Sequence, residues 1–168
     1  MRIAGLLHES IVDGPGVRFV VFCQGCPHRC PGCHNPETWD FGGGGEYTVR
    51  QLIKEIRKAP ALVRGVTLSG GEPFSQPGEM AQLASRVHGL GMDVVTYTGF
   101  LYEELLEKAR KDPEVERLLA ETDLLVDGPF VEAKKDIGLR FRGSSNQRII
   151  DVKKSREAGK TVVLDEEE

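Results

Sequence analysis

Short apolar strands and amphipathic helices alternate along this sequence, and that order leaves few folds open. Strands are predicted where β-branched and aromatic residues run together, at residues 18–23, 66–69, 93–97 and 124–126. Helices are predicted where apolar residues recur at i, i+3, i+4 and i+7, at residues 49–56, 77–88, 101–111 and in a short segment from Pro113. The order is typical of an α/β fold with a mostly parallel sheet and right-handed crossovers.

Four loop segments rich in glycine, proline or cysteine follow predicted strands directly. They comprise residues 23–35, 70–73, 97–99 and 127–129. Because parallel strands end at a common edge of the sheet, we expect these segments to meet there. The sequence therefore predicts one composite site built from all four.

Length and composition favour a single domain over residues 1–168. A chain of 168 residues suits one domain but falls short of the roughly 250 residues of a complete eightfold barrel. The net charge of -4 gives no bulk attraction to nucleic acid or to an anionic membrane. No apolar run approaches the roughly 20 residues of a membrane span, and the N-terminal apolar stretch is too short for a signal peptide. We therefore expect a cytoplasmic protein.

All four cysteines fall within residues 23–33, so they cannot crosslink distant parts of the chain. Clustered thiols of this kind suggest a reducing compartment. Cys26, Cys30 and Cys33 have the spacing C-x3-C-x2-C. Three such thiolates can hold three corners of a 4Fe–4S cluster, which is normally held by four cysteines. The spacing therefore indicates a cluster with one iron open to another ligand.

The cysteine spacing also allows a structural zinc site. Three cysteines and one histidine can bind zinc, and His28 and His34 lie close by. Cys23 could supply a fourth sulfur, but the two C-x2-C pairs are only three residues apart, against the roughly 15–20 of a zinc ribbon. On a strand, Cys23 shares a face with two apolar residues, which favours a packed thiol.

Residues 70–73 read Gly-Gly-Glu-Pro and directly follow a predicted strand. Two glycines let the backbone approach a ligand closely and adopt positive φ. Their carbonyls and the Glu72 carboxylate can accept hydrogen bonds from an ammonium group. The segment lacks the lysine and the spacing of a Walker loop. The alternative is a tight turn with an exposed Glu72, but an edge shared with the cysteines favours a binding loop.

Together, the cysteine and glycine segments resemble the radical S-adenosylmethionine superfamily. The matching residues are Cys26, Cys30 and Cys33 in its cluster motif and Gly70, Gly71, Glu72 and Pro73 in its GGEP motif. The resemblance implies that the open iron chelates the amino and carboxylate groups of S-adenosylmethionine, and that the GGEP backbone meets the methionine amino group. It also implies a partial, incomplete (β/α) barrel with its site at the strand carboxyl ends.

Further segments narrow the resemblance to the glycyl-radical activating enzymes. Residues 13–18 and 33–39 resemble that group as a whole, which includes the activators of pyruvate formate-lyase. Residues 125–130 and 142–148 are similar to stretches of the activators of anaerobic ribonucleoside-triphosphate reductase. The similarity covers residues 8–150, and the tail 151–168 matches nothing useful. Pro129 stands where formate-lyase activators carry a lysine. A contact made by that lysine is therefore not expected in this chain.

The resemblance implies an oxidoreductase that generates a glycyl radical on a large partner enzyme. A flavodoxin-like or other one-electron donor would reduce the cluster, and S-adenosylmethionine would then yield methionine and a 5′-deoxyadenosyl radical. That radical would take the α-hydrogen of one glycine in the large subunit of anaerobic ribonucleoside-triphosphate reductase. No catalytic side chain beyond the cluster ligands is expected, and no nucleic acid or membrane partner.

The other candidate residues fall into two groups. Asp127 and Asn146 are expected to contact the cofactor, and Asp13, Gly14, Pro15 and Arg148 are expected to contact the partner. Turn formation is the alternative for residues 13–16 and for Asp127.

Two rival functions stay open on the sequence alone. The chain could activate another glycyl-radical enzyme, such as pyruvate formate-lyase. It could also be a non-catalytic zinc or iron–sulfur binding module, although that function leaves residues 70–73 and the four converging segments unexplained.

The alternation of predicted strands and helices becomes less regular after residue 130. Residues 149–150 and 162–164 suggest short edge strands joined by a charged connector at 153–160. Residues 165–168 suggest a frayed acidic tail, and the glycines at 42–45 suggest a flexible hinge.

Overall fold

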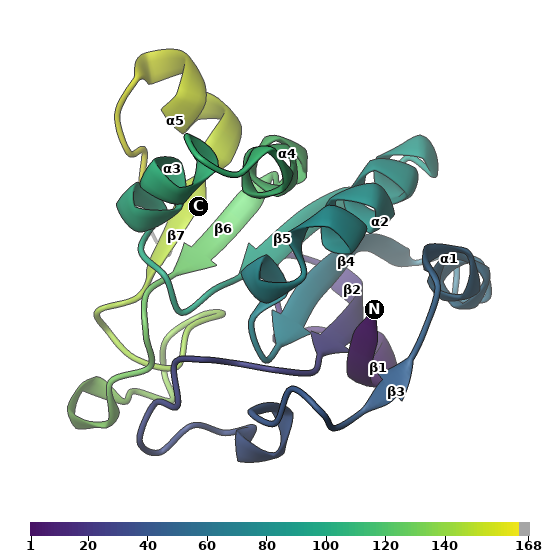
Figure 1. The fold of residues 1–168 in the computed structure, drawn as a ribbon, viewed down its shortest axis with the longest axis horizontal. Coiled ribbons are helices and arrows are strands. Elements are labelled where there is room, and N and C mark those ends of the chain that lie inside the picture. Colours follow the sequence, from purple (N-terminus) through teal and green to yellow (C-terminus); the bar gives the residue numbers. More distant parts are fainter. Residues whose placement is uncertain (165–168) are drawn as a thin grey trace.

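The computed structural model describes residues 1–164, which form a seven-stranded mixed sheet and five α-helices (Figure 1). The strand order is β3-β1-β2-β4-β5-β6-β7. The four central strands are parallel: β2 (Val17–Cys23), β4 (Val63–Gly70), β5 (Asp93–Tyr97) and β6 (Leu124–Asp127). The outer strands are antiparallel to their neighbours: β1 (Arg2–Ser10), β3 (Gly45–Glu46) and β7 (Arg148–Asp151). The predicted α/β class is confirmed.

The helices begin at capping residues or prolines. They are α1 (Val49–Arg57), α2 (Pro77–Gly89), α3 (Tyr102–Ala109), α4 (Pro113–Glu121) and α5 (Val152–Ala158), with short 3-10 turns at Pro36–Thr38, Pro73–Ser75 and Glu132–Lys134. The capping box predicted by the sequence forms at α1: Gln51 N donates to Thr48 Oγ1 at 3.1 Å, and Thr48 N donates to Gln51 Oε1 at 2.8 Å.

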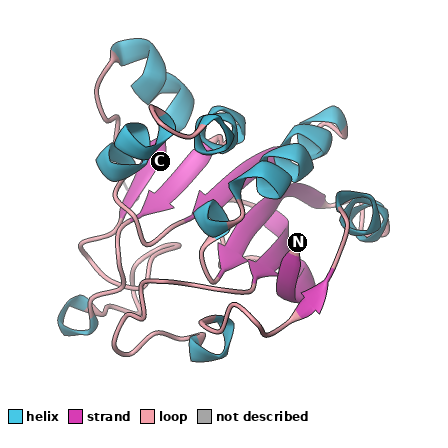
Figure 2. Cartoon of the chain, viewed as in Figure 1, coloured by secondary structure: helices cyan, strands magenta, loops and turns pink. Residues whose placement is uncertain are grey.

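The helices cover one face of the sheet (Figure 2). Buried residues of α1 to α5 form a single apolar cluster with alternate strand residues, such as Phe19 and Val21 of β2 and Val66 and Leu68 of β4. Each large apolar side chain that is fully buried contributes about 1.5–3 kcal/mol relative to an exposed one. This face therefore provides most of the hydrophobic stabilisation of the fold.

The opposite face of the sheet is packed by strand and loop residues. Val95, Val126 and Ile149 form a small cluster there, and Tyr97 and Phe141 pack against it. The hydroxyl of Tyr97 donates to the Phe141 carbonyl at 2.5 Å. That bond ties the segment between β6 and β7 to β5.

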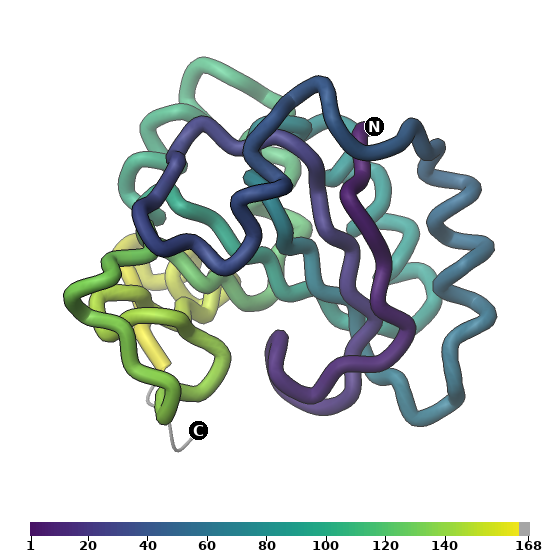
Figure 3. Tube along the Cα trace, turned by 90° about the horizontal axis from the view of Figure 1, so that it is seen from below, coloured from purple at the N-terminus to yellow at the C-terminus, as the bar shows by residue number. Residues whose placement is uncertain are grey.

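Two long connections leave the carboxyl ends of central strands. Residues 24–44 follow β2, and residues 128–147 follow β6. They approach one another, with the His34 and Phe130 rings 5.3 Å apart, and Figure 3 shows them in dark blue and green. The carboxyl edge of the sheet is therefore enclosed mainly by loops.

The glycines at 42–45, predicted to be a flexible hinge, are held in place. The Arg2 guanidinium donates to the carbonyls of Gly42, Gly43 and Gly44, and Gly45 pairs with Ile3 as part of β3. The hinge prediction was wrong because the cation that binds these carbonyls comes from a strand about 40 residues away in sequence, which local composition does not reveal.

The C-terminal region also differs from the prediction. Residues 152–158 form α5 rather than a charged connector, and Val163 makes a single bridge to Ile150 rather than a strand. Helix α5 is short and buries only Val152 and Ser155, so its apolar period is hard to see. The predicted acidic tail lies outside the described residues. Within residues 1–164, no helix is long and apolar enough to cross a membrane.

Candidate functional site

A cavity of about 860 Å³ opens at the carboxyl ends of the central strands. Its wall includes residues from all four segments that the sequence brings to this edge. The lining residues from those segments include Cys26, Cys30, Cys33, Gly70, Gly71, Tyr97, Thr98, Gly99 and Gly128. The predicted composite site is therefore formed, and its volume suits a small-molecule ligand.

The cysteine loop (residues 24–35) is closed at its base by backbone hydrogen bonds. Gly25 N donates to Thr38 O at 2.6 Å, and Cys26 N donates to Trp39 O at 3.2 Å. A turn brings Cys33 N to Cys30 O at 3.1 Å. These bonds direct three thiols toward one cavity from a stretch of eight residues.

Backbone amides lie near the sulfur of two of the three thiols. Burial raises the pKa of the Cys26 thiol, while the amides of His28 and Arg29 donate toward its sulfur and act in the opposite direction. Asn35 N donates to Cys33 Sγ at 3.4 Å. Amides pointed at sulfur stabilise negative charge there, which suits a thiolate ligand.

Cys23 is not part of this wall. Its side chain is fully buried on the helix-covered face, with Sγ 3.6 Å from Met80 Sδ. Burial strongly raises the pKa of this thiol. The prediction of a packed thiol is confirmed, so three sulfur donors face the cavity.

This donor set fits a cluster held by three cysteines. Cys26, Cys30 and Cys33 all line the cavity, and a cubane takes one cysteine sulfur on each of three irons. Cys26, Cys30 and Cys33 are the residues that would hold it.

The glycine loop (residues 70–73) lies against the start of the cysteine loop. Gly71 N donates to Cys23 O and Glu72 N donates to Gly25 O, both at 2.8 Å. Gly70 has φ +93°, and a Cβ there would lie 2.5 Å from Cys23 N. A Cβ on Gly71 would lie 2.4 Å from Gly25 O. Only glycine allows the two backbones to approach this closely.

Glu72 joins three of the loops that surround the cavity. Its carboxylate accepts hydrogen bonds from Phe74 N at 3.0 Å and from Thr98 Oγ1 and Gly99 N at 2.8 Å. Nε2 of His28 lies 2.6 Å from Oε1. The side chain is fully buried, so the alternative of an exposed Glu72 at a simple turn is wrong.

Asp127 and Arg148 lie beside one another, outside the cavity wall. Asp127 is fully buried at the end of β6. Arg148 donates to it through Nε at 3.0 Å and Nη2 at 2.5 Å. The two residues that the sequence assigned to different ligands therefore bind each other.

Asn146 is held by a bond from its Nδ2 to Pro129 O at 2.8 Å, whereas its Oδ1 is buried without a partner in the described part of the chain. Asp13 lines the cavity, and Gly14 and Pro15 continue the turn behind it. Pro73 is buried at the start of the 3-10 turn after the glycine loop.

Sequence reasoning missed the role of Arg18. This fully buried guanidinium donates to Thr67 Oγ1 at 2.8 Å and Pro15 O at 3.0 Å, and it lies 2.6 Å from Asp93 Oδ1. It therefore holds the turn at residues 13–16 onto the sheet. An arginine in an otherwise apolar strand was the available signal, since buried charges are paired.

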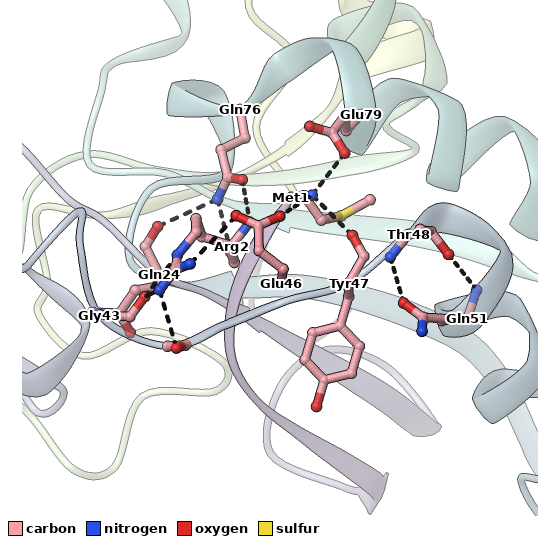
Figure 4. A network of polar contacts seen from close by, with 11 residues as sticks. Met1, Arg2, Gln24, Gly43, Glu46, Tyr47, Thr48, Gln51, Gln76 and Glu79 are labelled. Carbon is pink, nitrogen blue, oxygen red and sulfur yellow. Dashed lines mark hydrogen bonds and ion pairs between the residues drawn. The ribbon is translucent and has the colours of Figure 1, made fainter.

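A second polar network anchors the far side of the cysteine loop (Figure 4). Gln24 Nε2 donates to Asp40 O at 2.6 Å and to Glu37 O at 3.0 Å. Gln76 Nε2 donates to Arg2 O at 2.9 Å and to Gln24 O at 3.3 Å. Strand β1, the cysteine loop and the start of α2 are thereby joined.

Known proteins are similar to this chain in sequence. Residues 12–150 match the family of 4Fe-4S single cluster domains. The anaerobic ribonucleoside-triphosphate reductase-activating protein of Vibrio cholerae is 37% identical over 147 residues, covering 83% of this chain and 91% of its own. Its counterpart from Escherichia coli K12 is 36% identical, covering 82% and 90%.

Two further similarities are less extensive. The pyruvate formate-lyase-activating enzyme of Clostridium pasteurianum is 41% identical over 114 residues, covering 63% of this chain and 48% of its own. The crystal structure of QueE from Escherichia coli overlaps 58% of this chain and 51% of its own, with a TM-score of 0.47 and 19% identity. The extended matches show that the chain belongs to the glycyl-radical activating enzymes, among the anaerobic ribonucleoside-triphosphate reductase-activating proteins with a 4Fe–4S single cluster domain.

Proposed function

We propose that this chain generates a glycyl radical on anaerobic ribonucleoside-triphosphate reductase with a 4Fe–4S cluster and S-adenosylmethionine bound in the cavity. The supporting observation is that three cysteines and the glycine loop face one cavity, while the fourth cysteine is packed in the core. When bound and reduced, the cluster supplies the electron that releases a 5′-deoxyadenosyl radical from S-adenosylmethionine.

The protein's own residues would bind the cluster and orient S-adenosylmethionine beside it. Cys26, Cys30 and Cys33 would bind the irons as thiolates, with backbone amides stabilising charge on Cys26 and Cys33. The backbone of Gly70 and Gly71 would receive the methionine ammonium, because both residues line the cavity.

Other residues would complete the cofactor site. Glu72 and Pro73 would fix the glycine loop, since Glu72 is bonded to its neighbours on three sides. Asn146 would act indirectly, because it does not line the cavity and its Nδ2 donates to Pro129 O at 2.8 Å. Asp127 would act indirectly, by ordering the start of α3 through its bond from Tyr102 N at 2.8 Å.

The partner would bring its glycine-bearing segment to the open side of the cavity. We infer an incomplete (β/α) barrel, because the sheet carries its helices on one face. Asp13 lines the cavity, and Gly14 and Pro15 follow it in the same turn. Arg148 would act indirectly, by holding the end of β6 through Asp127. Ile11 and Ile137 line the cavity and are 73% and 94% exposed, so a bound segment would cover them and exclude water.

Glycine suits this reaction because its α-carbon radical is delocalised along the backbone and has no side chain to crowd it. A flavodoxin-like protein or another one-electron donor would provide the reducing electron. Such chemistry, with free thiols at its centre, suits the cytoplasm.

A second target is pyruvate formate-lyase, and the match to an activating enzyme of that protein favours it. The match covers less than half of that relative, so the reductase remains the better-supported partner. The two are distinguished by which large enzyme acquires the radical.

Anaerobic reconstitution tests the proposal. We expect about four irons per chain and cleavage of S-adenosylmethionine on addition of dithionite. With the reductase large subunit present, electron paramagnetic resonance should show a glycyl-radical doublet. Protein that holds only zinc, or a Cys30→Ala variant that still cleaves S-adenosylmethionine, contradicts the proposal.

A further inference from the structure

We propose that His28 is a positioning residue that fixes the cysteine loop against the glycine loop through Glu72. The inference rests on the proposed function, because it concerns where the cluster lies relative to the S-adenosylmethionine site. His28 stands between Cys26 and Cys30 in the sequence. Its Nε2 lies 2.6 Å from Glu72 Oε1, and the Glu72 side chain is fully buried.

The direction of this hydrogen bond follows from the other partners of Glu72. Oε1 also accepts from Thr98 Oγ1 and Gly99 N, both at 2.8 Å. Because the oxygen facing His28 is an acceptor, we assign the ring proton to Nε2. His28 therefore adds a donor from the cysteine loop to a carboxylate already bonded to the end of β5.

The imidazole is held tightly on two further sides. It meets the Phe100 ring edge-on, with the centroids 4.5 Å apart. A Cβ placed on Gly99 would lie only 2.4 Å from His28 Cδ2. The ring thus occupies a fitted position at the carboxyl end of β5, and its side chain is only 16% exposed.

Within residues 1–164, no other hydrogen bond joins the tip of the cysteine loop (residues 27–32) to another element. Backbone bonds anchor the loop at Gly25 and Cys26, and Cys33 N bonds within the loop. Among the described residues, the His28–Glu72 bond is the one that joins residues 27–32 to another element. Its loss should let Cys30, and with it Cys33, whose N donates to Cys30 O, shift relative to Gly70 and Gly71.

Three variants test this inference. His28→Ala removes the donor, and His28→Gln places an amide N–H at a similar reach toward Glu72. His8→Ala is the matched control, because it removes the same type of side chain from an exposed position beside Glu55, outside the cavity wall.

The first measurement is anaerobic titration of the reduced, iron-loaded protein with S-adenosylmethionine, followed by electron paramagnetic resonance. We expect His28→Ala to keep its iron but to need about tenfold more S-adenosylmethionine for the same spectral change, a factor that corresponds to a modest loss of binding free energy. His28→Gln should recover most of the difference, and His8→Ala should match the wild type.

The second measurement needs no cluster. Trypsin cleavage of the metal-free, reduced protein after Arg29 should be several-fold faster in His28→Ala than in the wild type, because a released loop tip enters the protease more readily. Cleavage after the exposed Arg140, in the segment between β6 and β7, should be unchanged and serves as the internal reference. His28→Gln should again return toward the wild type.

The outcomes separate the two proposals. If the wild-type cluster gives no response to S-adenosylmethionine, the proposed function fails. If the wild type responds, and His28→Ala matches it in both titration and proteolysis, the positioning role fails. If His28→Ala cannot be loaded with iron, the result for His28→Gln is decisive. A normal response of His28→Gln to S-adenosylmethionine supports the role of the hydrogen bond. The same failure to load iron in His28→Gln overturns that role.

Discussion

Nη2 of Arg148 lies 2.5 Å from Oδ2 of Asp127, and the same guanidinium donates to both oxygens of Glu103 at 2.9 and 2.7 Å. One cation therefore joins β7, the end of β6 and α3. The same Asp127 oxygen accepts from Tyr102 N at the start of α3. Asp127 is fully buried and Arg148 is 28% exposed, so the pair is largely shielded from water.

Replacing Arg148 with alanine should destabilise the fold, because Asp127 would remain buried without its cation. We expect the free energy of unfolding to fall by about 2–3 kcal/mol, at or below the lower end for breaking a buried pair because the arginine is partly solvated. Urea unfolding of the wild type and Arg148→Ala measures this change.

Arg156→Ala provides the matched control for that experiment. Arg156 pairs with Glu116 at the surface, and a pair of this kind is worth less than about 1 kcal/mol. Equal losses in the two variants would contradict the structural role of Arg148. A loss of the cofactor response in Arg148→Ala without any loss of stability would instead make the pair part of a binding site.

The parallel core of the fold was predictable because its signals are local. Strand β5 spans the predicted residues Asp93–Tyr97, and α1 has the predicted capping box. Strand β1 was missed because its burial pattern has no regular period of two. It is held instead by antiparallel pairing with β2, an interaction between strands that composition does not specify.

The site was predictable where backbone topology determines it. Strand order brings the cysteines and the glycine loop to one edge, as expected. The side-chain bonds were not predictable, because His28 and Glu72 are 44 residues apart and meet only after both loops have folded. The same holds for the cation that Arg18 places under the turn at residues 13–16.

A methyl group on Gly71 should separate the glycine loop from the cysteine loop. The added Cβ would lie 2.4 Å from the carbonyl oxygen of Gly25. Because this oxygen belongs to the backbone, it cannot move aside as the end of a flexible side chain can. We expect Gly71→Ala to lose about 1–3 kcal/mol of unfolding free energy, measured by urea denaturation, and to weaken the spectral response of the reduced cluster to S-adenosylmethionine.

Gly89→Ala is the control for that substitution. Gly89 is the last residue of α2, and nothing lies within 4 Å of a Cβ placed there. Alanine at this position should leave stability unchanged or raise it by up to about 1 kcal/mol, because alanine favours the helix. If both variants were equally stable, close contact at Gly71 would not be the reason for glycine.

His88 should make stability depend on pH. Burial of the ring opposes its charged form, but hydrogen bonds with Asp123 at 2.8 Å and Glu121 at 2.7 Å outweigh that effect and raise the pKa of His88. A raised pKa in the folded state means that the charged ring stabilises the fold fully below its ordinary value of 6.5. That contribution is lost as the pH rises through the folded-state pKa.

The measurement is the urea midpoint at about pH 6 and about pH 8 at constant ionic strength, a range that brackets the ordinary histidine pKa. The wild type should lose more stability over this interval than His88→Gln, which cannot titrate. An identical change in the two proteins would show that the ring contributes nothing to the pH dependence.

Cys23 and Cys26 should respond in opposite ways to alanine. Cys23 packs against Met80 in the core, so Cys23→Ala should retain about four irons and lose about 1–2 kcal/mol of stability to the small cavity left behind. Cys26 lines the site, so Cys26→Ala should lose the cluster with little change in stability of the metal-free fold. Iron content and urea unfolding, measured on the same preparations of both variants, test these two expectations. Loss of iron in Cys23→Ala would show that the buried thiol is a cluster ligand.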